Sequence, residues 1–258
     1  MKIRANGIDI RYEVSGSGPW LTLSHSLCCD ASMWAPQLAA LEPHFTVLRF
    51  DTRGHGQSDA PAGAYTFGQL TDDVIGLLDA LKIERTHFCG LSMGGMIGQH
   101  LALKAPGRID RLVLADTTSR LPPESRALWP ERIRIVGEQG TGALAQSTLE
   151  RWFTPPYRAA HPEVMARIGG LIRATPVDGY AGCAQAIAQI DITGRLHDVK
   201  APTLVVVGAE DGGTPPALSR EIAEAIPGAR LEIIPGASHL SNIEQAEAFN
   251  KLLLDFLS

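Results

Sequence analysis

The sequence predicts one α/β domain, in which a mostly parallel central sheet is flanked by helices and interrupted by an all-helical insertion between late strands. Short apolar runs alternate with amphipathic helical patterns along most of the 258 residues, as in a sheet covered on both faces. Between residues 118 and 200 this alternation stops, and only helical patterns remain, separated by Pro and Gly. We therefore expect a core of residues 1–117 and 201–258 and a helical lid of residues 118–200.

Composition narrows the class of protein. Hydrophobic residues make up 45% and charged residues 20%, the balance of an ordinary globular domain. The net charge is -5 and no basic run is present, which argues against nucleic acid as a partner. No stretch approaches the roughly 20 apolar residues of a membrane span, and residues 1–12 lack the apolar core of a signal peptide. We expect no membrane association and a cytoplasmic location, and the sequence makes no prediction of oligomeric state.

The predicted elements follow in chain order. Residues 8–14 alternate apolar and polar side chains, residues 15–19 are turn formers, and residues 20–23 are apolar, which together predict a hairpin. Further strands are predicted over residues 45–50, 86–89, 111–115, 203–207 and 231–234. Helices are predicted over residues 33–41, 70–81, 92–103 and 244–257, and in the insertion near 124–138, 143–152, 163–173 and 180–190.

The sharpest motif is Gly90-Leu91-Ser92-Met93-Gly94, which follows a predicted strand and opens a predicted helix. It matches the G-x-S-x-G nucleophile elbow, in which a strained turn lifts a serine hydroxyl above the sheet. Glycines at both ends let neighbouring backbone approach closely. The alternative is a helix N-cap serine in a glycine-rich turn, which would need no catalytic partners. We predict Ser92 as a nucleophile.

A serine hydroxyl needs an adjacent base, and chain order selects one among the eight histidines. In the fold that carries this elbow, the partners follow as Ser, then Asp or Glu, then His. His239 comes just after the last predicted strand, at the sheet edge where sites in open α/β folds assemble. Asp211 follows the strand before it and is the predicted acid, with Glu210 and Asp116 as alternatives. The acid would hold the imidazole tautomer and stabilise the imidazolium.

Two backbone amides are predicted to stabilise the oxyanion. One belongs to Met93, directly after the nucleophile, and the other to a loop after an early strand, where Leu27 is the candidate. Each such donor contributes roughly 3 kcal/mol to transition-state stabilisation. We expect His25 to shape this loop rather than to act as a second base.

No metal or organic cofactor is predicted. The four cysteines lack the spacing of a zinc site or of a C-x-x-C redox pair, so small buried apolar residues are the better interpretation. Residues 51–58 (DTRGHGQS) form a distinctive loop without the Gly-Lys-Ser/Thr ending of a phosphate-binding P-loop. A structural turn is expected there, with Arg53 as a candidate for holding an anionic substrate.

Four segments carry a resemblance to a known family that spans nearly the whole chain: residues 51–56 (DTRGHG), 88–95 (FCGLSMGG), 150–155 (ERWFTP) and 238–245 (SHLSNIEQ). The first two are shared by many hydrolases, whereas the last two are more particular. Through them the chain resembles the 3-oxoadipate enol-lactonases of the α/β-hydrolase superfamily.

The resemblance implies a triad of Ser92, Asp211 and His239, in agreement with the chain order above. It also implies the activity, which is the opening of a small enol-lactone to a 3-oxo dicarboxylate during bacterial breakdown of aromatic acids. Ser92 would attack the lactone carbonyl, and water activated by His239 would release the acyl-enzyme. Direct attack by water is the other route.

The implied substrate carries a carboxylate, which calls for an Arg or Lys in the pocket. Arg53, Arg134 and Arg173 are the candidates from the sequence. Trp152 is predicted as a lid-side wall of the pocket, with a core position as the alternative.

Two departures from the family pattern lie near the predicted pocket. Cys28 stands where the family has a glycine in the oxyanion loop, and Gly212-Gly213 replaces a bulkier pair after the acid. Both leave the triad intact and bear on the substrate. The alternative functions are a carboxylesterase or carbon–carbon bond hydrolase of the same fold, and a non-catalytic scaffold that binds ligands.

Overall fold

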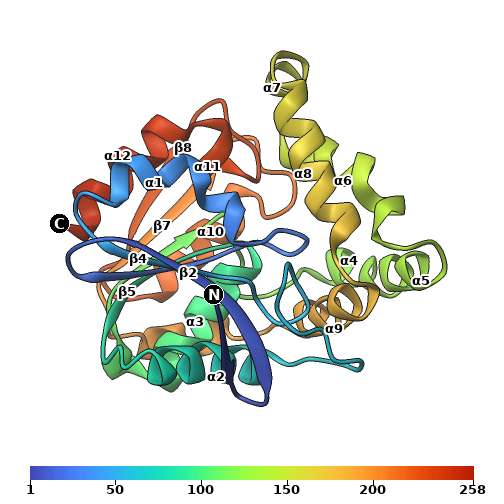
Figure 1. The fold of residues 1–258 in the computed structure, drawn as a ribbon. Helices are drawn as coiled ribbons and strands as arrows, with labels where there is room; N and C mark the ends of the chain where they lie inside the picture. Colours follow the sequence, from blue (N-terminus) through green and yellow to red (C-terminus); the bar gives the residue numbers. More distant parts are fainter.

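An eight-stranded sheet forms the centre of the computed structural model, which describes residues 1–258 (Figure 1). The strand order is β1-β2-β4-β3-β5-β6-β7-β8, and every pair from β4 onward in that order is parallel. The predicted mostly parallel α/β sheet is therefore confirmed. The strands are β1 (Lys2–Ala5), β2 (Ile8–Gly16), β3 (Trp20–Ser24), β4 (Thr46–Phe50), β5 (Thr86–Leu91), β6 (Ile109–Ala115), β7 (Thr203–Gly208) and β8 (Arg230–Ile234).

Helices cover both faces of the sheet. In Figure 1, α1 (Ala35–Leu41) and α12 (Ala246–Leu257) lie on one side of the sheet, and α2 (Phe67–Ala80) and α3 (Met93–Lys104) on the other. Helix α10 (Pro216–Ala225) packs against β7 and β8, and α11 (Ser241–Glu244) precedes α12. Four short 3₁₀ helices span Ala31–Trp34, Pro106–Arg108, Thr141–Leu144 and Thr193–Asp198.

Helix α2 illustrates how the sequence sets these elements. Leu70, Val74 and Leu77 recur at helical spacing and are fully buried against the sheet and α3. Thr66 begins the helix, because its hydroxyl accepts a hydrogen bond from the backbone N–H of Gln69 at 3.1 Å. An apolar stripe and one capping side chain thus define both the buried face and the first turn.

The predicted hairpin at the N-terminus was wrong. Strand β2 pairs with β1 on one side and with β4 on the other, and β3 pairs with β4 and β5. The real hairpin is β1–β2, whose two-residue turn Asn6-Gly7 has positive φ at both positions. Gly16 and Gly18 instead carry the chain across the start of β4: a Cβ on either would lie 2.4 Å from the carbonyl oxygen of Phe45 or of His44, respectively.

The segment between β6 and β7 contains six α-helices, which gather to one side of the sheet (Figure 1). The chain leaves and returns side by side, because Arg120 and Asp191 form an isolated bridge and Ile192 N donates to Ser119 O at 2.9 Å. Four of the helices match predicted ones. The lid function and the limits at residues 118 and 200 stay predictions. The helices are α4 (Pro123–Arg126), α5 (Trp129–Gln139), α6 (Ala145–Trp152), α7 (Pro155–Ala160), α8 (Pro162–Ala174) and α9 (Val177–Ala188).

Two smaller findings complete the fold. All four cysteines are buried and free, so their interpretation as small apolar core residues is confirmed. None of the helices combines the length and apolar character that crossing a bilayer requires.

Candidate active site

Ser92 occupies the turn between β5 and α3 in a conformation that few non-glycine residues adopt. Its φ is 56° and its ψ is -114°, and such backbone strain costs on the order of 1–3 kcal/mol. Hydrogen bonds hold the turn in place: Ser92 N donates to Ala115 O at 2.8 Å, and the Thr117 hydroxyl donates to Ser92 O at 2.7 Å. The strained turn is thereby fixed to β6 and the residues after it.

Gly90 and Gly94 let neighbouring backbone lie closer than any side chain would allow. A Cβ on Gly90 would lie 2.1 Å from the carbonyl oxygen of Gly94, and a Cβ on Gly94 would lie 2.1 Å from that of Ser24. Both contacts are too short for any side chain, and both involve backbone that has no freedom to shift. The elbow therefore packs directly against the end of β3, next to the loop predicted to hold the oxyanion.

The structure brings the three predicted triad residues into one hydrogen-bonded line. The Ser92 hydroxyl donates to Nε2 of His239 at 3.0 Å, and Nδ1 of His239 donates to Oδ2 of Asp211 at 2.8 Å. All three side chains are at least 90% buried. A carboxylate can only accept, so it fixes the imidazole tautomer that leaves Nε2 free to take the serine proton.

Asp211 is held as a carboxylate. Its burial opposes ionisation, but the charge of His239 and hydrogen bonds from His239 and Thr214 outweigh that effect and lower the pKa of Asp211 from its ordinary value. Backbone N–H groups of Gly213 and Thr214 donate to Oδ1 at 2.7 and 2.9 Å, and the Thr214 hydroxyl donates to Oδ2 at 2.7 Å. The negative charge that orients His239 is thus permanent near neutral pH.

The two rival acids are placed elsewhere. Asp116 accepts from Gly208 N at 2.8 Å and from the Ser241 hydroxyl at 2.5 Å, and it makes no hydrogen bond to His239. Burial, reinforced by the charge of Asp211, raises the pKa of Asp116 well above its ordinary value. Glu210 is exposed. The geometry therefore favours Asp211 among the three carboxylates.

The two predicted oxyanion donors are the backbone N–H groups of Met93 and Leu27. Met93 is the first residue of α3, so its N–H has no acceptor within the helix. Leu27 lines the same cavity as Ser92 and His239, and its N–H donates to no acceptor in the protein. Both amides are therefore free to donate, and their role as the oxyanion hole stays a prediction.

Two buried histidines hold the Leu27 loop. Nε2 of His25 accepts from Thr52 N at 2.9 Å, and Nε2 of His55 accepts from Cys28 N at 3.1 Å, while each Nδ1 lies within hydrogen-bond distance of a backbone carbonyl. Burial, with the neighbouring His25, lowers the pKa of His55 to about 3, so it stays neutral. The structure thus gives His25 the loop-shaping position that was expected.

Cys28 shows why the resembling family has a glycine at this position. Its φ is 61°, a left-handed conformation that a side chain disfavours. The His55 bond to its N–H fixes that conformation, and burial raises the pKa of its thiol to about 12. Cys28 therefore adds local strain and a buried neutral thiol to the loop.

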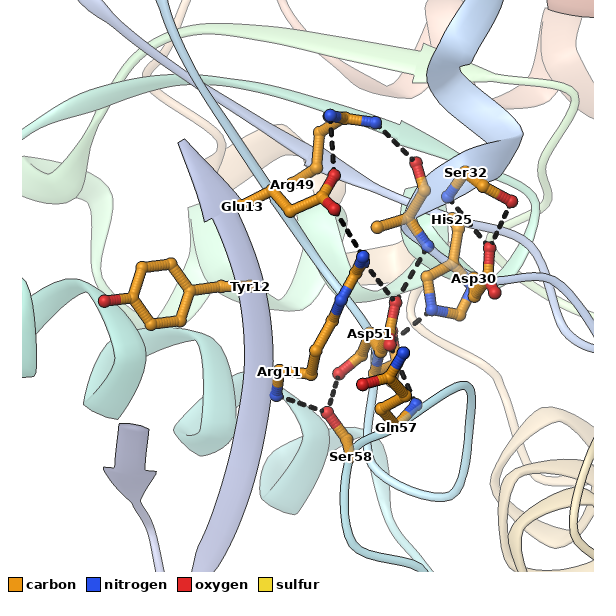
Figure 2. Close-up of polar contacts among 12 residues, drawn as sticks. Arg11, Tyr12, Glu13, His25, Asp30, Ser32, Arg49, Asp51, Gln57 and Ser58 are labelled. Atoms are coloured by element: carbon orange, nitrogen blue, oxygen red, sulfur yellow. Dashed lines mark hydrogen bonds and ion pairs between the residues drawn. The ribbon is translucent and has the colours of Figure 1, made fainter. Parts of the chain in front are cut away.

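Figure 2 shows a second support of the same loop, centred on Asp51. Oδ1 of Asp51 accepts from Ala31 N at 2.9 Å and from the Arg11 guanidinium at 3.3 Å, and Oδ2 accepts from Gln57 N at 2.9 Å. Arg11 in turn pairs with Glu13 at 2.5 Å. This network ties the end of β4 to the loop after β3, so residues 51–58 are a structural turn beside the site, as expected.

Ser92 and His239 both line one cavity. Its far wall comes from the helical segment between β6 and β7, including Trp129, Arg132 and Trp152. The ring centroid of Trp152 lies 5.8 Å from that of His239. The structure therefore places Trp152 in the cavity wall, and its role in substrate binding stays a prediction.

The three arginines proposed for a substrate carboxylate do not line this cavity. The prediction that Arg53 holds a substrate anion was wrong, because its guanidinium is buried and makes a bidentate ion pair with Asp73 at 2.6 and 2.7 Å. Arg134 is exposed and pairs with neighbouring glutamates on α5, and Arg173 is exposed on α8. None of the three can meet a ligand bound at Ser92.

Two other arginines line the cavity and were missed. Arg132 comes from α5 and Arg151 from α6, each beside a tryptophan of the same helix. The guanidinium of Arg132 lies over the ring of Trp129, 5.2 Å from its centroid. The sequence held two signals: the Trp129–Arg132 spacing of three, which places both residues on one helix face, and the position of Arg151 inside the segment 150–155.

The two more particular segments of the resemblance meet through Glu244. One carboxylate oxygen of Glu244 accepts from the backbone N–H and hydroxyl of Thr154, and the other accepts from Ser238 N at 2.8 Å. Thr154 follows Trp152 by two residues, and Ser238 precedes His239. This buried glutamate therefore links the cavity wall to the loop that carries the histidine.

A comparison with known proteins decides the family. The model of the α/β hydrolase fold family matches residues 19–246. The chain belongs to the α/β-hydrolase family. This α/β-hydrolase is 38% identical to 3-oxoadipate enol-lactonase 2 of Acinetobacter baylyi, over 96% of the chain and 92% of the relative. The resemblance predicted from the four sequence segments is confirmed.

Solved structures of other α/β-hydrolases agree with this placement. The enol-lactonase from Burkholderia xenovorans LB400 is 46% identical, with a TM-score of 0.96, and covers 100% of this chain and 99% of its own. A thermophilic esterase from Thermogutta terrifontis, solved with malate bound, is 31% identical, with a TM-score of 0.95 and coverage of 100% and 98%.

Proposed function

We propose that this α/β-hydrolase opens 3-oxoadipate enol-lactone to 3-oxoadipate by nucleophilic catalysis. The observation that carries the proposal is the line of hydrogen bonds from Ser92 through His239 to Asp211, with Ser92 and His239 in the lining of one cavity. The similarity to enol-lactonases supports the choice of substrate. No metal or organic cofactor takes part in the proposed reaction.

The reaction proceeds in two halves. Ser92 Oγ attacks the lactone carbonyl carbon while its proton passes to Nε2 of His239, and the oxyanion accepts hydrogen bonds from the N–H groups of Leu27 and Met93. The ring C–O bond then breaks, and the enolate oxygen leaves, takes the proton from His239 and tautomerises to the ketone. Because an enolate is a good leaving group, this step needs little help from acid.

The second half releases the product. His239, again neutral, deprotonates a water molecule that attacks the acyl carbon on Ser92 Oγ. The serine leaves with the proton that His239 took from water, and the freed carboxylate makes the product a 3-oxo dicarboxylate. Asp211 stabilises the imidazolium in both halves, because its negative charge lies 2.8 Å from Nδ1.

A carboxylesterase acting on a simpler ester is the second candidate. The similarity to the Thermogutta terrifontis esterase favours it, and the same three residues would serve. That esterase was solved with malate, a small dicarboxylate, which suits either candidate.

Steady-state kinetics separate the two. We expect kcat/KM for 3-oxoadipate enol-lactone in the usual enzymatic range, about 10⁴–10⁸ M⁻¹s⁻¹, and a much lower value for p-nitrophenyl acetate. Spontaneous opening of the lactone is subtracted with enzyme-free buffer. Efficient cleavage of the aryl ester with scarcely any turnover of the lactone would reject the lactonase and favour the esterase.

A further inference from the structure

The loop after β7 leaves one edge of His239 uncovered. Gly213 lies in this loop, lines the same cavity as Ser92 and His239, and is exposed. A Cβ at this position would lie 3.3 Å from Nδ1 and 3.6 Å from Cε1 of His239. A residue that lines a cavity and also faces solvent lies at a mouth of that cavity. The cavity therefore opens beside the Nδ1–Cε1 edge of the imidazole.

Neither of the usual reasons for a glycine applies at position 213. Glycine is needed where φ is left-handed or where other backbone comes too close for a side chain. The φ of Gly213 lies outside the left-handed range, and the atoms nearest to a Cβ there belong to the side chains of Asp211 and His239, at 3.3 Å. At Gly90, by contrast, the nearest atom is a backbone oxygen at 2.1 Å. What glycine provides at position 213 is space beside His239.

The other neighbours of His239 in the cavity lining leave less room. The ring of Trp152 packs on the imidazole, with the two planes 31° apart, and covers one face of it. The Thr214 hydroxyl donates to Oδ2 of Asp211 at 2.7 Å, which holds this side chain against the acid. The free space next to the histidine therefore lies at Gly213.

The chemistry of the proposed reaction directs the leaving group to this part of the cavity. His239 returns its proton from Nε2 to the departing oxygen, so the group on that oxygen lies next to the imidazole. Cε1 is bonded to Nε2, and the cavity lining continues from Ser92 past the ring to Gly213. A large group on the departing oxygen would therefore extend along the Cε1 edge into the space at position 213.

We infer that Gly213 is a specificity-determining residue, which admits lactones and esters with a bulky or branched group on the departing oxygen. The space at position 213 receives that group while the acyl carbon lies against Ser92. The inference rests on the proposed function for the direction of proton transfer, and it defines the substrate class by the leaving group. A bulkier residue at this position, as in the family pattern, would fill the space.

Two aryl acetates that share one acyl group test this inference. Phenyl acetate and 1-naphthyl acetate differ in the size of the leaving group and little in its acidity. We expect Gly213→Val to lower kcat/KM for the naphthyl ester about 10- to 100-fold more than for the phenyl ester, and Gly213→Ala to shift the ratio less in the same direction. Gly212→Val is the matched control and should keep the wild-type ratio, because Gly212 is exposed, does not line the cavity and has nothing within 4 Å of a Cβ.

A second pair of esters, p-nitrophenyl acetate and butyrate, varies the acyl group instead. Their ratio of kcat/KM should be the same in wild type and in both Gly213 variants, because the acyl chain lies on the other side of the reacting carbon. An unchanged naphthyl-to-phenyl ratio in Gly213→Ala and Gly213→Val, an equal shift in the acyl pair, or an equal loss on every ester would overturn the inference. If the naphthyl-to-phenyl ratio shifts as expected but the enol-lactone is not hydrolysed, the role of Gly213 stands and the proposed lactone substrate fails.

Discussion

Replacing Ser92 with alanine is expected to lower kcat for enol-lactone opening by about 10⁶-fold, the loss seen when the nucleophile of a serine hydrolase is removed. The fold should remain, because alanine meets the same backbone strain at φ 56° and the hydrogen bonds at the turn come from backbone atoms of residue 92. The measurement is steady-state kinetics on the lactone, with circular dichroism to show that the variant is folded.

Ser219→Ala provides the matched control. Ser219 is also buried, its hydroxyl has no partner, and it lies on α10 away from the cavity lining. Its variant should keep the wild-type kcat. Ser92→Ala turnover within tenfold of the wild type would remove Ser92 from the mechanism and favour water activated by another group.

Asp211→Asn is expected to lower kcat by about 10⁴-fold, the effect of this change in a serine protease triad. The asparagine oxygen can still accept from the Gly213 and Thr214 amides, which turns its NH₂ group toward His239. Nδ1 of His239 must then accept instead of donate. The proton moves to Nε2, where it blocks proton transfer from Ser92.

Variants of the two rival carboxylates make this prediction specific. Glu210→Gln changes an exposed side chain and should leave kcat unaltered. Asp116→Asn should cost far less than Asp211→Asn, because Asp116 bonds to Gly208 N and the Ser241 hydroxyl and makes no hydrogen bond to His239. A large loss in Asp116→Asn together with activity in Asp211→Asn would show that the acid had been assigned to the wrong residue.

How much of the fold the sequence predicts depends on how each strand is buried. Strand β7 lies inside the sheet, so its uninterrupted apolar run Thr203–Gly208 is visible from composition alone. Strand β1 is short and lies at the edge of the sheet, and its charged residues Lys2 and Arg4 interrupt the apolar pattern by which a strand is predicted. The pairing of β2 with β4 was missed because a glycine-rich turn shows only that the chain changes direction. The same turn occurs when the chain closes a hairpin and when it passes to a strand elsewhere in the sheet.

The residues of the candidate site also differ in how far the sequence predicts them. Ser92, Asp211 and His239 follow strand ends in a fixed chain order, so local signals and topology bring them together. The cavity positions of Arg132 and Arg151 could not be predicted from such signals, because helix periodicity does not say which face of a helix turns toward the cavity. Arg134, two residues from Arg132, points to solvent, and only the packing of α5 against its neighbours separates the two.

The most direct test of the central claim is the intact mass of the protein after treatment with a fluorophosphonate at pH 7, followed by peptide mapping. A serine activated by His239 and flanked by two free amides should take one phosphonyl group per chain, on Ser92, and His239→Gln should slow the labelling strongly. An active protein that takes no label, or carries it on a residue other than Ser92, would contradict the account.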